Sequence, residues 1–255
     1  MTGAMIGSMI EFVDIEKRFG EKTVLGGVSL SIARGEVFFI VGTSGAGKSV
    51  LIKHLVGLLR PDAGTLRFDG TDLTDLDEEG FYPVRKRCAM VFQHSTLFDS
   101  MTCAENVALP LRKHTGLGHR EALAEARRRL EIVRMQEFAD RYPAEIGDGL
   151  RKRVAIARAL TLDPQAVLFD EPTTSLDPVS ARRVDRLIRE LADRLAMTCV
   201  VVSHDLSSIF GIADRIAMLY RGRVQLLGTP EEFRRSDDPI VSQFINGRAD
   251  GPMEV

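Results

Sequence analysis

The segment Gly42–Ser49 reads GTSGAGKS and fits the phosphate-binding pattern G-x-x-x-x-G-K-[ST]. An apolar stretch typical of a buried strand precedes it and a helical pattern follows it, which is the placement that anion binding requires. Glycines let successive backbone N–H groups face one anion, Lys48 is expected to reach the β- and γ-phosphates, and the Ser49 hydroxyl is expected to bind Mg²⁺. The alternative is a glycine-rich structural turn, which the flanking strand and helix disfavour. The predicted nucleotide contacts are Gly42, Thr43, Ser44, Gly45, Ala46, Gly47, Lys48, Ser49 and Val50.

A pair of acids follows a second apolar run, in the segment AVLFDE. Asp170 is placed to hold Mg²⁺ through water, and Glu171 to orient the attacking water. An apolar strand that ends in Asp-Glu is common, so this pair means little alone. Together with the loop at Gly42 it predicts the catalytic half of the same site, where metal and lysine offset two adjacent negative charges.

Composition bounds the remaining possibilities. The 255 residues suffice for one large α/β domain or two small ones, and a formal net charge of −2 gives no global sign of nucleic-acid or anionic-membrane binding. The basic runs at 85–87, 127–129 and 151–153 are interpreted as solvated helix faces. Three cysteines without a CxxC pair are expected to be buried or inert thiols.

No segment predicts export or membrane insertion. The start, MTGAMIGSMI, lacks the basic and apolar regions of a signal peptide, and no apolar run approaches the roughly 18 residues that cross a bilayer. If the protein works at a membrane, another subunit is expected to do the crossing.

The elements that would position these residues alternate in type along the chain. Apolar, β-rich runs predict strands at 9–15, 22–32, 35–42, 64–70, 88–92, 166–170, 198–203 and 215–220. Helical patterns cover 49–59, which stops at Arg60-Pro61, and also 119–133, the basic stretch before 160, and 179–195. A helical insert from 93 to 164 therefore interrupts a mostly parallel sheet.

The order of the motifs resembles the nucleotide-binding subunit of ABC transporters across nearly the full length. The resemblance implies an α/β fold, with a P-loop (RecA-like) mostly parallel sheet core, an antiparallel β subdomain and an inserted helical subdomain. It implies one ABC ATPase domain at 9–236, with the core at 9–92 and 165–236 and the helical subdomain at 93–164. A C-terminal helix and tail would occupy 237–255. The implied activity is ATP hydrolysis with ATP and Mg²⁺.

Further site residues are carried over from this family motif by motif. Gln93 in MVFQHS matches the glutamine loop, which contacts Mg²⁺ or water and the transmembrane partner, and His204 in VVVSHD matches the switch histidine at the γ-phosphate. Asp177 in TTSLDP matches the interfacial D-loop, and Phe19 in KRFG sits where the family stacks an aromatic ring on adenine. The alternatives are that residues 203–205 only cap the next helix and that Phe19 is a core aromatic.

The segment IGDGL departs from the family's Leu-Ser-Gly-Gly-Gln signature, in which each subunit's loop faces the γ-phosphate bound by the other. Gly147 lacks the serine hydroxyl, at a cost of roughly 1–3 kcal/mol if nothing replaces it. Asp148 would repel a phosphate about 4 Å away by about 4 kcal/mol per unit charge, unless it caps the next helix and pairs with Arg151 or Lys152. Gly149 alone keeps its type. Two interpretations stay open: a slow or partner-dependent ATPase, and a nucleotide-gated dimerisation module with weak hydrolysis.

A narrower similarity joins MVFQHSTLFDSMTCAENVALPLRKHT and the terminal QFINGRADGP to the ATPase of Mla-type phospholipid transporters, which maintain outer-membrane lipid asymmetry. It implies a homodimer in the ATP-bound state, an integral-membrane permease, an MCE-domain lipid-binding protein and, in some systems, a STAS-domain subunit. The protein would lie at the cytoplasmic face of the inner membrane. The alternatives are the ATPase of another small-solute ABC transporter and a soluble ABC protein acting on DNA or ribosomes. Proteins of that last class usually carry two cassettes or a long coiled-coil insert, and no nucleic-acid partner is expected here.

Overall fold

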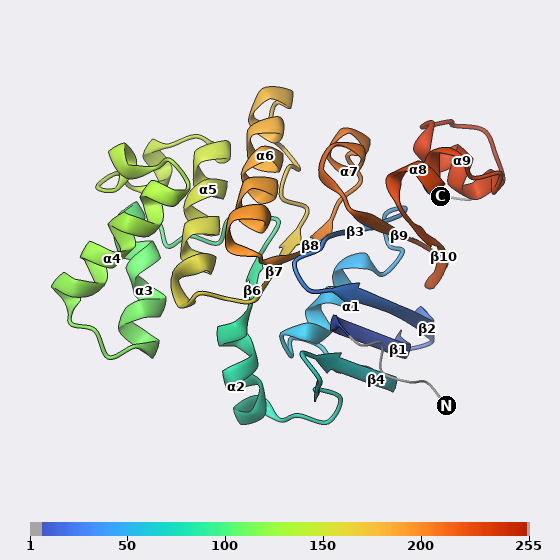
Figure 1. The fold of residues 1–255 in the computed structure, drawn as a ribbon, viewed down its shortest axis with the longest axis horizontal. Helices are drawn as coiled ribbons and strands as arrows, with labels where there is room; N and C mark the ends of the chain where they lie inside the picture. Colours follow the sequence, from blue (N-terminus) through green and yellow to red (C-terminus); the bar gives the residue numbers. More distant parts are fainter. Residues whose placement is uncertain (1–6, 254–255) are drawn as a thin grey trace.

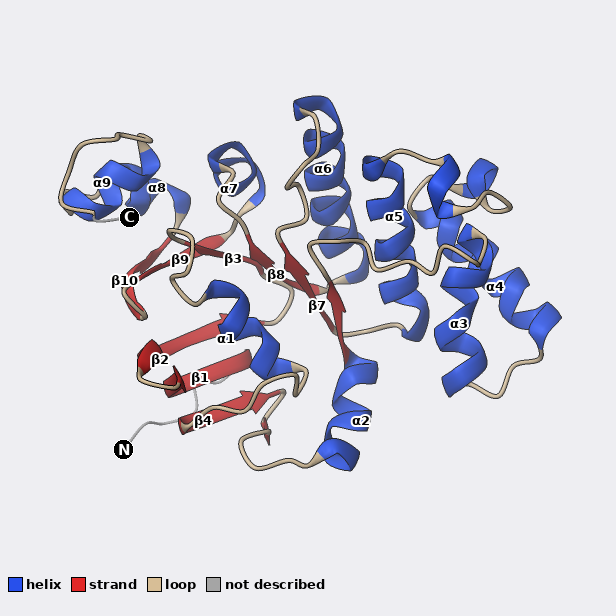
Figure 2. Cartoon of the chain, turned by 180° about the vertical axis from the view of Figure 1, so that it is seen from behind, coloured by secondary structure: helices blue, strands red, loops and turns tan. Residues whose placement is uncertain are grey.

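The computed structural model describes residues 7–253 and contains two β-sheets with helices between and around them (Figures 1 and 2). The strands are β1 (Ser8–Phe19), β2 (Lys22–Ala33), β3 (Val37–Val41), β4 (Ala63–Phe68), β5 (Thr71–Asp72), β6 (Cys88–Val91), β7 (Ala166–Asp170), β8 (Thr198–Val202), β9 (Arg215–Tyr220) and β10 (Arg223–Gly228). The helices are α1 (Lys48–Leu55), α2 (Glu78–Arg87), α3 (Cys103–His114), α4 (His119–Ile132), α5 (Asp148–Ala159), α6 (Pro178–Leu195), α7 (Leu206–Ile212), α8 (Pro230–Arg234) and α9 (Pro239–Ile245). Short 3₁₀ turns are η1 (Gln136–Phe138), η2 (Pro143–Glu145) and η3 (Leu160–Leu162).

The larger sheet has the strand order β10-β9-β3-β8-β7-β6. Strands β9, β3, β8, β7 and β6 are parallel, and β10 runs antiparallel to β9. Every residue of β3, β7 and β8 is buried, which explains why these strands read as continuous apolar runs and not as alternating patterns. The smaller sheet, β2-β1-β4-β5, is antiparallel throughout. The predicted fold class is therefore confirmed.

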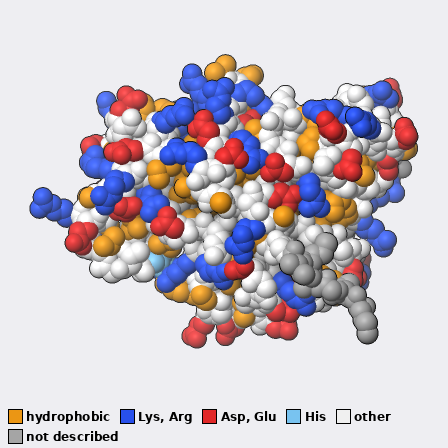
Figure 3. Space-filling view, in the orientation of Figure 1, with side chains coloured by type: hydrophobic (Ala, Val, Ile, Leu, Met, Phe, Trp, Pro, Cys, Tyr) orange, Lys and Arg blue, Asp and Glu red, His pale blue; other side chains and the backbone are white. Residues whose placement is uncertain are grey.

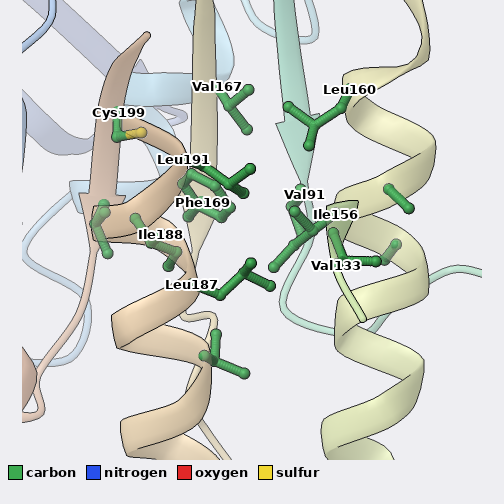
Figure 4. Packing of buried hydrophobic residues seen from close by; sticks show 14 of the residues in the cluster. Val91, Val133, Ile156, Leu160, Val167, Phe169, Leu187, Ile188, Leu191 and Cys199 are labelled. Atoms are coloured by element: carbon green, nitrogen blue, oxygen red, sulfur yellow. The ribbon is translucent and has the colours of Figure 1, made fainter. Parts of the chain in front are cut away.

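The larger sheet separates two hydrophobic clusters. Phe38 and Ile40 of β3 face α1 and the antiparallel sheet, whereas Phe39 of the same strand faces the cluster formed with α5 and α6. Figure 4 shows this second face: Phe169 of β7 lies between side chains of α6, such as Ile188, and of α5, such as Ile156. Because apolar side chains cover both faces, the sheet is held rigidly between its helices. The motifs that follow its strands are therefore held at fixed positions along one edge.

Between β6 and β7 the chain forms α3, α4 and α5, which lie together at one end of the molecule (Figure 1). Helix α3 was not predicted, although Thr102 and Glu105 form a capping box at its start, in which each side chain accepts from the other's backbone N–H. The subdomain boundaries at 93 and 164 stay a prediction.

The end of α1 differs from the prediction. The helix stops at Leu55 and not at Arg60-Pro61, because Gly57 adopts φ +67° and the chain turns there. The N–H of Leu58 donates to the carbonyl of Lys53 at 3.1 Å, which closes the helix. A Cβ on residue 57 would meet the ring of Phe81 at 2.5 Å, so α2 packs where only glycine fits.

The cysteines, the apolar character of the helices and the surface charges can be compared with the expectations from composition. The three cysteines are buried and free, as expected, and burial raises the pKa of the Cys88 thiol to about 12. Within residues 7–253 no helix has the length and apolar character needed to span a bilayer. Charged side chains of both signs are interspersed on the face shown in Figure 3. Helix α9 lies inside the expected C-terminal segment 237–255, whose last two residues lie outside the described part.

Candidate functional site

Four of the predicted motifs follow four strands of the larger sheet that run parallel to one another. The phosphate loop follows β3, Gln93 follows β6, the Asp170–Glu171 pair ends β7, and His204 follows β8. Parallel strands have their carboxyl ends at one edge, and ligands of open α/β sheets bind outside that edge. The topology therefore gathers these motifs at one edge, although they are far apart in the sequence.

A cavity of about 840 Å³ opens at this edge. Most of the predicted nucleotide contacts line it, but Ala46 packs into the core. The predicted metal ligand Asp170 is 6% exposed and is not among the lining residues. The predicted residues that line it are Phe19, Gly42, Thr43, Ser44, Gly45, Gly47, Lys48, Ser49, Val50, Gln93, Glu171 and His204.

The phosphate loop has the tight geometry that anion binding needs. Gly42 has φ +138°, and a Cβ there would meet the backbone oxygen of Leu219 at 2.1 Å, so only glycine fits. The ammonium of Lys48 donates to the carbonyls of Gly42 and Thr43, each at 2.9 Å. Burial lowers the pKa of Lys48, and the nearby carboxylates of Glu171 and Asp170 partly oppose that shift. This ammonium thus lies within its own loop, ready to exchange carbonyl partners for phosphate oxygens.

Two of the three predicted Mg²⁺ ligands, Ser49 and Asp170, lie side by side, and the third, Gln93, lines the same cavity. The Ser49 hydroxyl donates to Oδ1 of Asp170 at 2.6 Å, which brings two hard oxygen donors to one point beside the loop. Mg²⁺ usually takes one or two protein oxygens and completes its shell with waters and substrate phosphates. Among residues 7–253 no three His, Cys, Asp or Glu side chains form a metal cluster. The donor set fits Mg²⁺ bound together with a nucleotide.

Glu171 and His204 form a pair across β7 and β8. Nδ1 of His204 lies 2.9 Å from Oε2 of Glu171, and the hydroxyl of Thr174 donates to the same oxygen at 3.0 Å. Glu171 has φ +50°, a costly conformation for a residue with a side chain, and its N–H donates to the carbonyl of Val202 at 2.9 Å. The carboxylate is thus held by two side chains, and both Glu171 and His204 line the cavity.

The capping alternative for residues 203–205 applies to Asp205 only. Its carboxylate accepts from the N–H of Ser207 at 2.9 Å at the start of α7, and Ser203 accepts from the N–H of Asp205. The imidazole of His204 instead points to Glu171 and is 64% exposed. Phe19 is also exposed, at 48%, and lies at the cavity wall, so it is not a core aromatic.

The signature segment lies apart from the cavity of its own chain. Gly147, Asp148 and Gly149 line a separate hollow of about 370 Å³ together with Asp177. The carboxylate of Asp177 accepts from the N–H groups of Val179 and Ser180, both at 3.0 Å, and so caps α6. A single chain therefore brings together the phosphate loop and the acids, but not the signature and D-loop segments.

The predicted capping role of Asp148 is wrong. Gly147 is the N-cap of α5, Asp148 is the first helical residue, and the side chain that it contacts is the guanidinium of Arg151. The predicted pairing with Arg151 is present, and a carboxylate in the first turn still interacts favourably with the helix dipole. Lys152 does not pair with Asp148 by hydrogen bonding.

Lys152 also contradicts its interpretation as part of a solvated basic face. It is 3% exposed, and its ammonium donates to the carbonyls of Phe92 at 3.0 Å and Gln93 at 2.6 Å. Burial lowers the pKa of Lys152 to about 8. Its neighbour Arg151 is partly exposed and ion-paired, as the interpretation expects.

Sequence reasoning missed other residues of the cavity. Lys22 and Val24 of β2 and Phe244 of α9 line it, and Phe244 comes from the far end of the chain. No local pattern distinguishes Phe244 from the other apolar residues of its helix. Thr174, whose hydroxyl donates to Glu171, follows it by only three residues, so its position in the sequence could have suggested this contact.

The chain is similar to a known protein family and to known proteins. Residues 25–174 match the family model described as "ABC transporter". The chain is 38% identical over 248 residues to the probable ribonucleotide transport ATP-binding protein mkl of Mycobacterium leprae (strain TN), covering 97% of this chain and 72% of the relative. It is 41% identical over 238 residues to the methionine import ATP-binding protein MetN of Brucella abortus (strain 2308), covering 93% of this chain and 64% of that relative.

Two solved structures are also similar. The dimeric post-hydrolysis state of the ATP-binding cassette MJ0796 bound to ADP and Pi has a TM-score of 0.79 at 31% identity, over 87% of this chain and 99% of that one. The cbiO1 protein of Clostridium perfringens, part of the ABC transporter complex cbiONQ, has a TM-score of 0.83 at 27% identity, over 95% of this chain and 96% of that one.

The chain belongs to the ABC transporter family. It is the ATP-binding subunit of an ABC transporter and an ATPase, with ATP as its substrate and Mg²⁺ as the usual accompanying ion. ABC cassettes dimerise and work with a membrane permease, which agrees with a signature segment that lies outside its own chain's cavity.

Proposed function

We propose that this chain is the ATP-hydrolysing subunit of an Mla-type phospholipid transporter at the cytoplasmic face of the inner membrane. The observation that carries its ATPase role is the meeting of Lys48, the Ser49–Asp170 pair and the Glu171–His204 pair at one sheet edge. The phospholipid assignment rests on the sequence similarity of the segment around Gln93 and of the C-terminal QFINGRADGP.

Each residue has a role that its position suggests. Lys48 leaves the carbonyls of its own loop to bind the β- and γ-phosphates, while the loop amides bind the same oxygens. Ser49, Asp170 and Gln93 would hold Mg²⁺ directly or through water, and the ion would neutralise charge that develops on the phosphates. Phe19 stacks on the adenine at the outer wall of the cavity.

Glu171 orients the attacking water and accepts its proton, and His204 contacts the γ-phosphate from the adjacent strand. The hydrogen bonds from Thr174 and His204 keep the Glu171 carboxylate at the cavity. The signature segment Gly147–Gly149 and Asp177 of a second copy complete the site across a homodimer interface. A permease contact near Gln93 then converts this closure into movement of the membrane subunit.

The partners implied by the proposal are a multispanning permease, an MCE-domain protein and, in some systems, a STAS-domain subunit. The names of the relatives offer two other substrate classes, since one is a probable ribonucleotide transport ATP-binding protein and another a methionine import ATP-binding protein. The decisive measurement is affinity purification of the tagged chain from detergent-solubilised membranes, with proteins and lipids identified by mass spectrometry.

We expect a permease, an MCE-domain protein and bound phospholipid to purify with the chain. The Lys48→Ala variant is the matched control: it removes a contact to phosphate at a residue other than Gln93, where we place the permease contact, so it should recover the same partners. Recovery of a permease with a soluble amino-acid- or nucleotide-binding protein, and without an MCE-domain protein, would overturn the lipid assignment and leave the ATPase intact.

A further inference from the structure

The loop that carries Gln93 connects the sheet core to the helical insert. It spans residues 92–102, between β6 and α3, and has no regular secondary structure. The ladder between β6 and β7 ends at the pair Val91–Phe169, one residue before the loop begins. What holds Gln93 in place must therefore come from contacts of the loop itself.

Two cationic side chains of α5 bind the first half of this loop. Lys152 donates to the carbonyls of Phe92 and Gln93, at 3.0 and 2.6 Å. Arg158, about 1.7 turns further along α5, donates to the carbonyl of Thr96 at 2.9 Å and to that of Ser95 at 3.3 Å. Arg158 also reaches the hydroxyl of Thr96 at 3.0 Å, and Thr96 has φ +47°. Four carbonyls within five residues are thus bonded to charged donors of one helix.

The second half of the loop is held by α3. Asn106 is fully buried, and its amide nitrogen donates to the carbonyls of Phe98 at 3.0 Å and of Met101 and Thr102 at 3.1 Å. Its amide oxygen accepts from the N–H of Phe98 at 2.7 Å. The loop is therefore fastened along its length to helices of the insert.

Helix α5 is also the helix whose first turn is the signature segment. Lys152 lies one turn from Asp148, and both line a hollow of about 400 Å³ together with Gln93. The ammonium of Lys152 is buried and needs hydrogen-bond acceptors from the protein in place of water. The carbonyls of Phe92 and Gln93 are these acceptors, which makes the two hydrogen bonds strong ones.

We propose that Lys152 and Arg158 are positioning residues, which fix the Gln93 loop to α5 and so set where the Gln93 side chain lies in the cavity. The same helix begins with the signature segment, so one element holds both the Gln93 loop and Gly147–Gly149. This inference rests on the role proposed for Gln93.

The test is a double-mutant cycle on the full chain, alone and in its detergent-purified complex. Lys152→Met and Arg158→Met remove the donors while keeping an unbranched side chain, and Gln93→Ala removes the side chain that they position. We expect each donor variant to lower kcat roughly tenfold with less than about a threefold change in the Kd for ATP, because the phosphate loop is untouched. In the Gln93→Ala background the same substitutions should cost less than about twofold, since they act through Gln93.

Conservative and distant variants separate positioning from simple structural loss. Lys152→Arg should recover at least half of the wild-type kcat, because a guanidinium can donate to the same two carbonyls. Lys113→Met and Arg128→Met, at exposed positions of α3 and α4, serve as matched controls and should keep wild-type kcat. If Lys152→Met does not fold in a thermal melt, Lys152→Gln takes its place in the cycle.

The outcomes are distinct. Normal activity of Gln93→Ala would remove the role proposed for Gln93, and with it this inference. A slow Gln93→Ala enzyme with normal donor variants would overturn the inference alone. Losses that add fully in the double variants would also overturn it, since they would show that the two cations act without Gln93.

Discussion

At the scale of single residues, the site places two carboxylates, which repel each other, near the ammonium of Lys48, which attracts both. Glu171 and Asp170 are adjacent in sequence, yet they serve different partners, because Asp170 turns to Ser49 while Glu171 turns to His204 and Thr174. Strand β7 ends at Asp170, and Glu171 leaves it with φ +50°, so the two neighbouring carboxylates face different partners and can serve a metal and a water separately.

Glu171→Gln should keep ATP binding and lower turnover to less than about a tenth of wild type. The amide keeps the size of the side chain but cannot accept a proton from the water. Lys48→Ala should weaken ATP binding itself, since it removes a charge-assisted contact to phosphate. A fluorescence titration and a phosphate-release assay on both variants distinguish the two losses. Turnover of Glu171→Gln above a tenth of wild type would exclude Glu171 as the base.

Asp148→Ala should cost less than about 1 kcal/mol of stability, because the carboxylate makes an exposed ion pair with Arg151 and interacts with the helix dipole but does not cap α5. Turnover should stay within a few-fold of wild type. A thermal melt and a turnover assay measure the two effects, with Asp148→Asn as the control that keeps the shape. A stability loss near 2 kcal/mol would restore the capping role, and much faster hydrolysis would place the carboxylate at the phosphate.

Gly147→Ser should raise turnover, by up to about tenfold for each 1.4 kcal/mol gained in the transition state. A Cβ on residue 147 would meet no atom within 4 Å, so the serine fits without displacing its neighbours. The same hydroxyl occupies the N-cap of α5 and can improve the cap by a few tenths of a kcal/mol. Gly147→Ala is the control, since it adds the carbon without the donor. Equal turnover in the serine and alanine variants would show that the missing hydroxyl does not limit hydrolysis.

At the scale of elements, the sequence predicted what depends on apolar runs and motif spacing. Strands β3, β7 and β8 are wholly buried and so carry an uninterrupted apolar signal, and the structure confirms the predicted strands before Gly42, Glu171 and His204. The end of α1 depends on the packing of Phe81 against Gly57, a contact between separate elements that local pattern does not contain. Lys152 was misread for the same reason, because only the fold shows that its ammonium meets the carbonyls of Phe92 and Gln93.

Helix α1 carries a buried histidine that predicts a pH dependence of stability. His54 is fully buried, Nδ1 lies 3.3 Å from the carbonyl of Leu51, and Nε2 has no hydrogen-bond partner within the described residues. Burial lowers the pKa of His54, and the positive charge of Lys17 acts in the same direction. The folded state therefore keeps this ring neutral at a pH where the unfolded chain takes up a proton.

The free energy of unfolding should thus fall as the pH drops below about 6.5, by at most about 1.4 kcal/mol per pH unit from this group. The contribution is constant above that pH, where the ring is neutral in both states. Denaturant melts between pH 7.5 and 5.5 measure the slope, and His54→Leu should flatten it. His119→Leu, at the exposed start of α4, is the control and should keep the wild-type slope. Equal slopes for wild type and His54→Leu would show that His54 binds its proton equally in both states.

At the scale of the whole molecule, the fold supplies one half of an ATP site at each of two places. The cavity at the sheet edge holds the phosphate loop, the acids and His204, whereas the signature segment and Asp177 line a separate hollow. A solved relative, the cassette MJ0796, is dimeric with ADP and Pi bound. Two copies placed with each hollow over the other's cavity would give each ATP both halves of its site.

ATP should therefore convert the chain from monomer to dimer when hydrolysis is blocked. Bound nucleotide would lie between the phosphate loop of one copy and the signature segment of the other, so it binds the dimer better than the monomer and shifts the equilibrium by mass action. Light scattering on Glu171→Gln should show the monomer mass without nucleotide and twice that mass with Mg-ATP. The double variant Lys48→Ala/Glu171→Gln is the matched control and should stay monomeric, because it lacks the contact that fixes the phosphates. If isolated Glu171→Gln keeps the monomer mass at saturating Mg-ATP, and if Mg-ATP also fails to join two copies of it when the permease is present, the composite site is excluded.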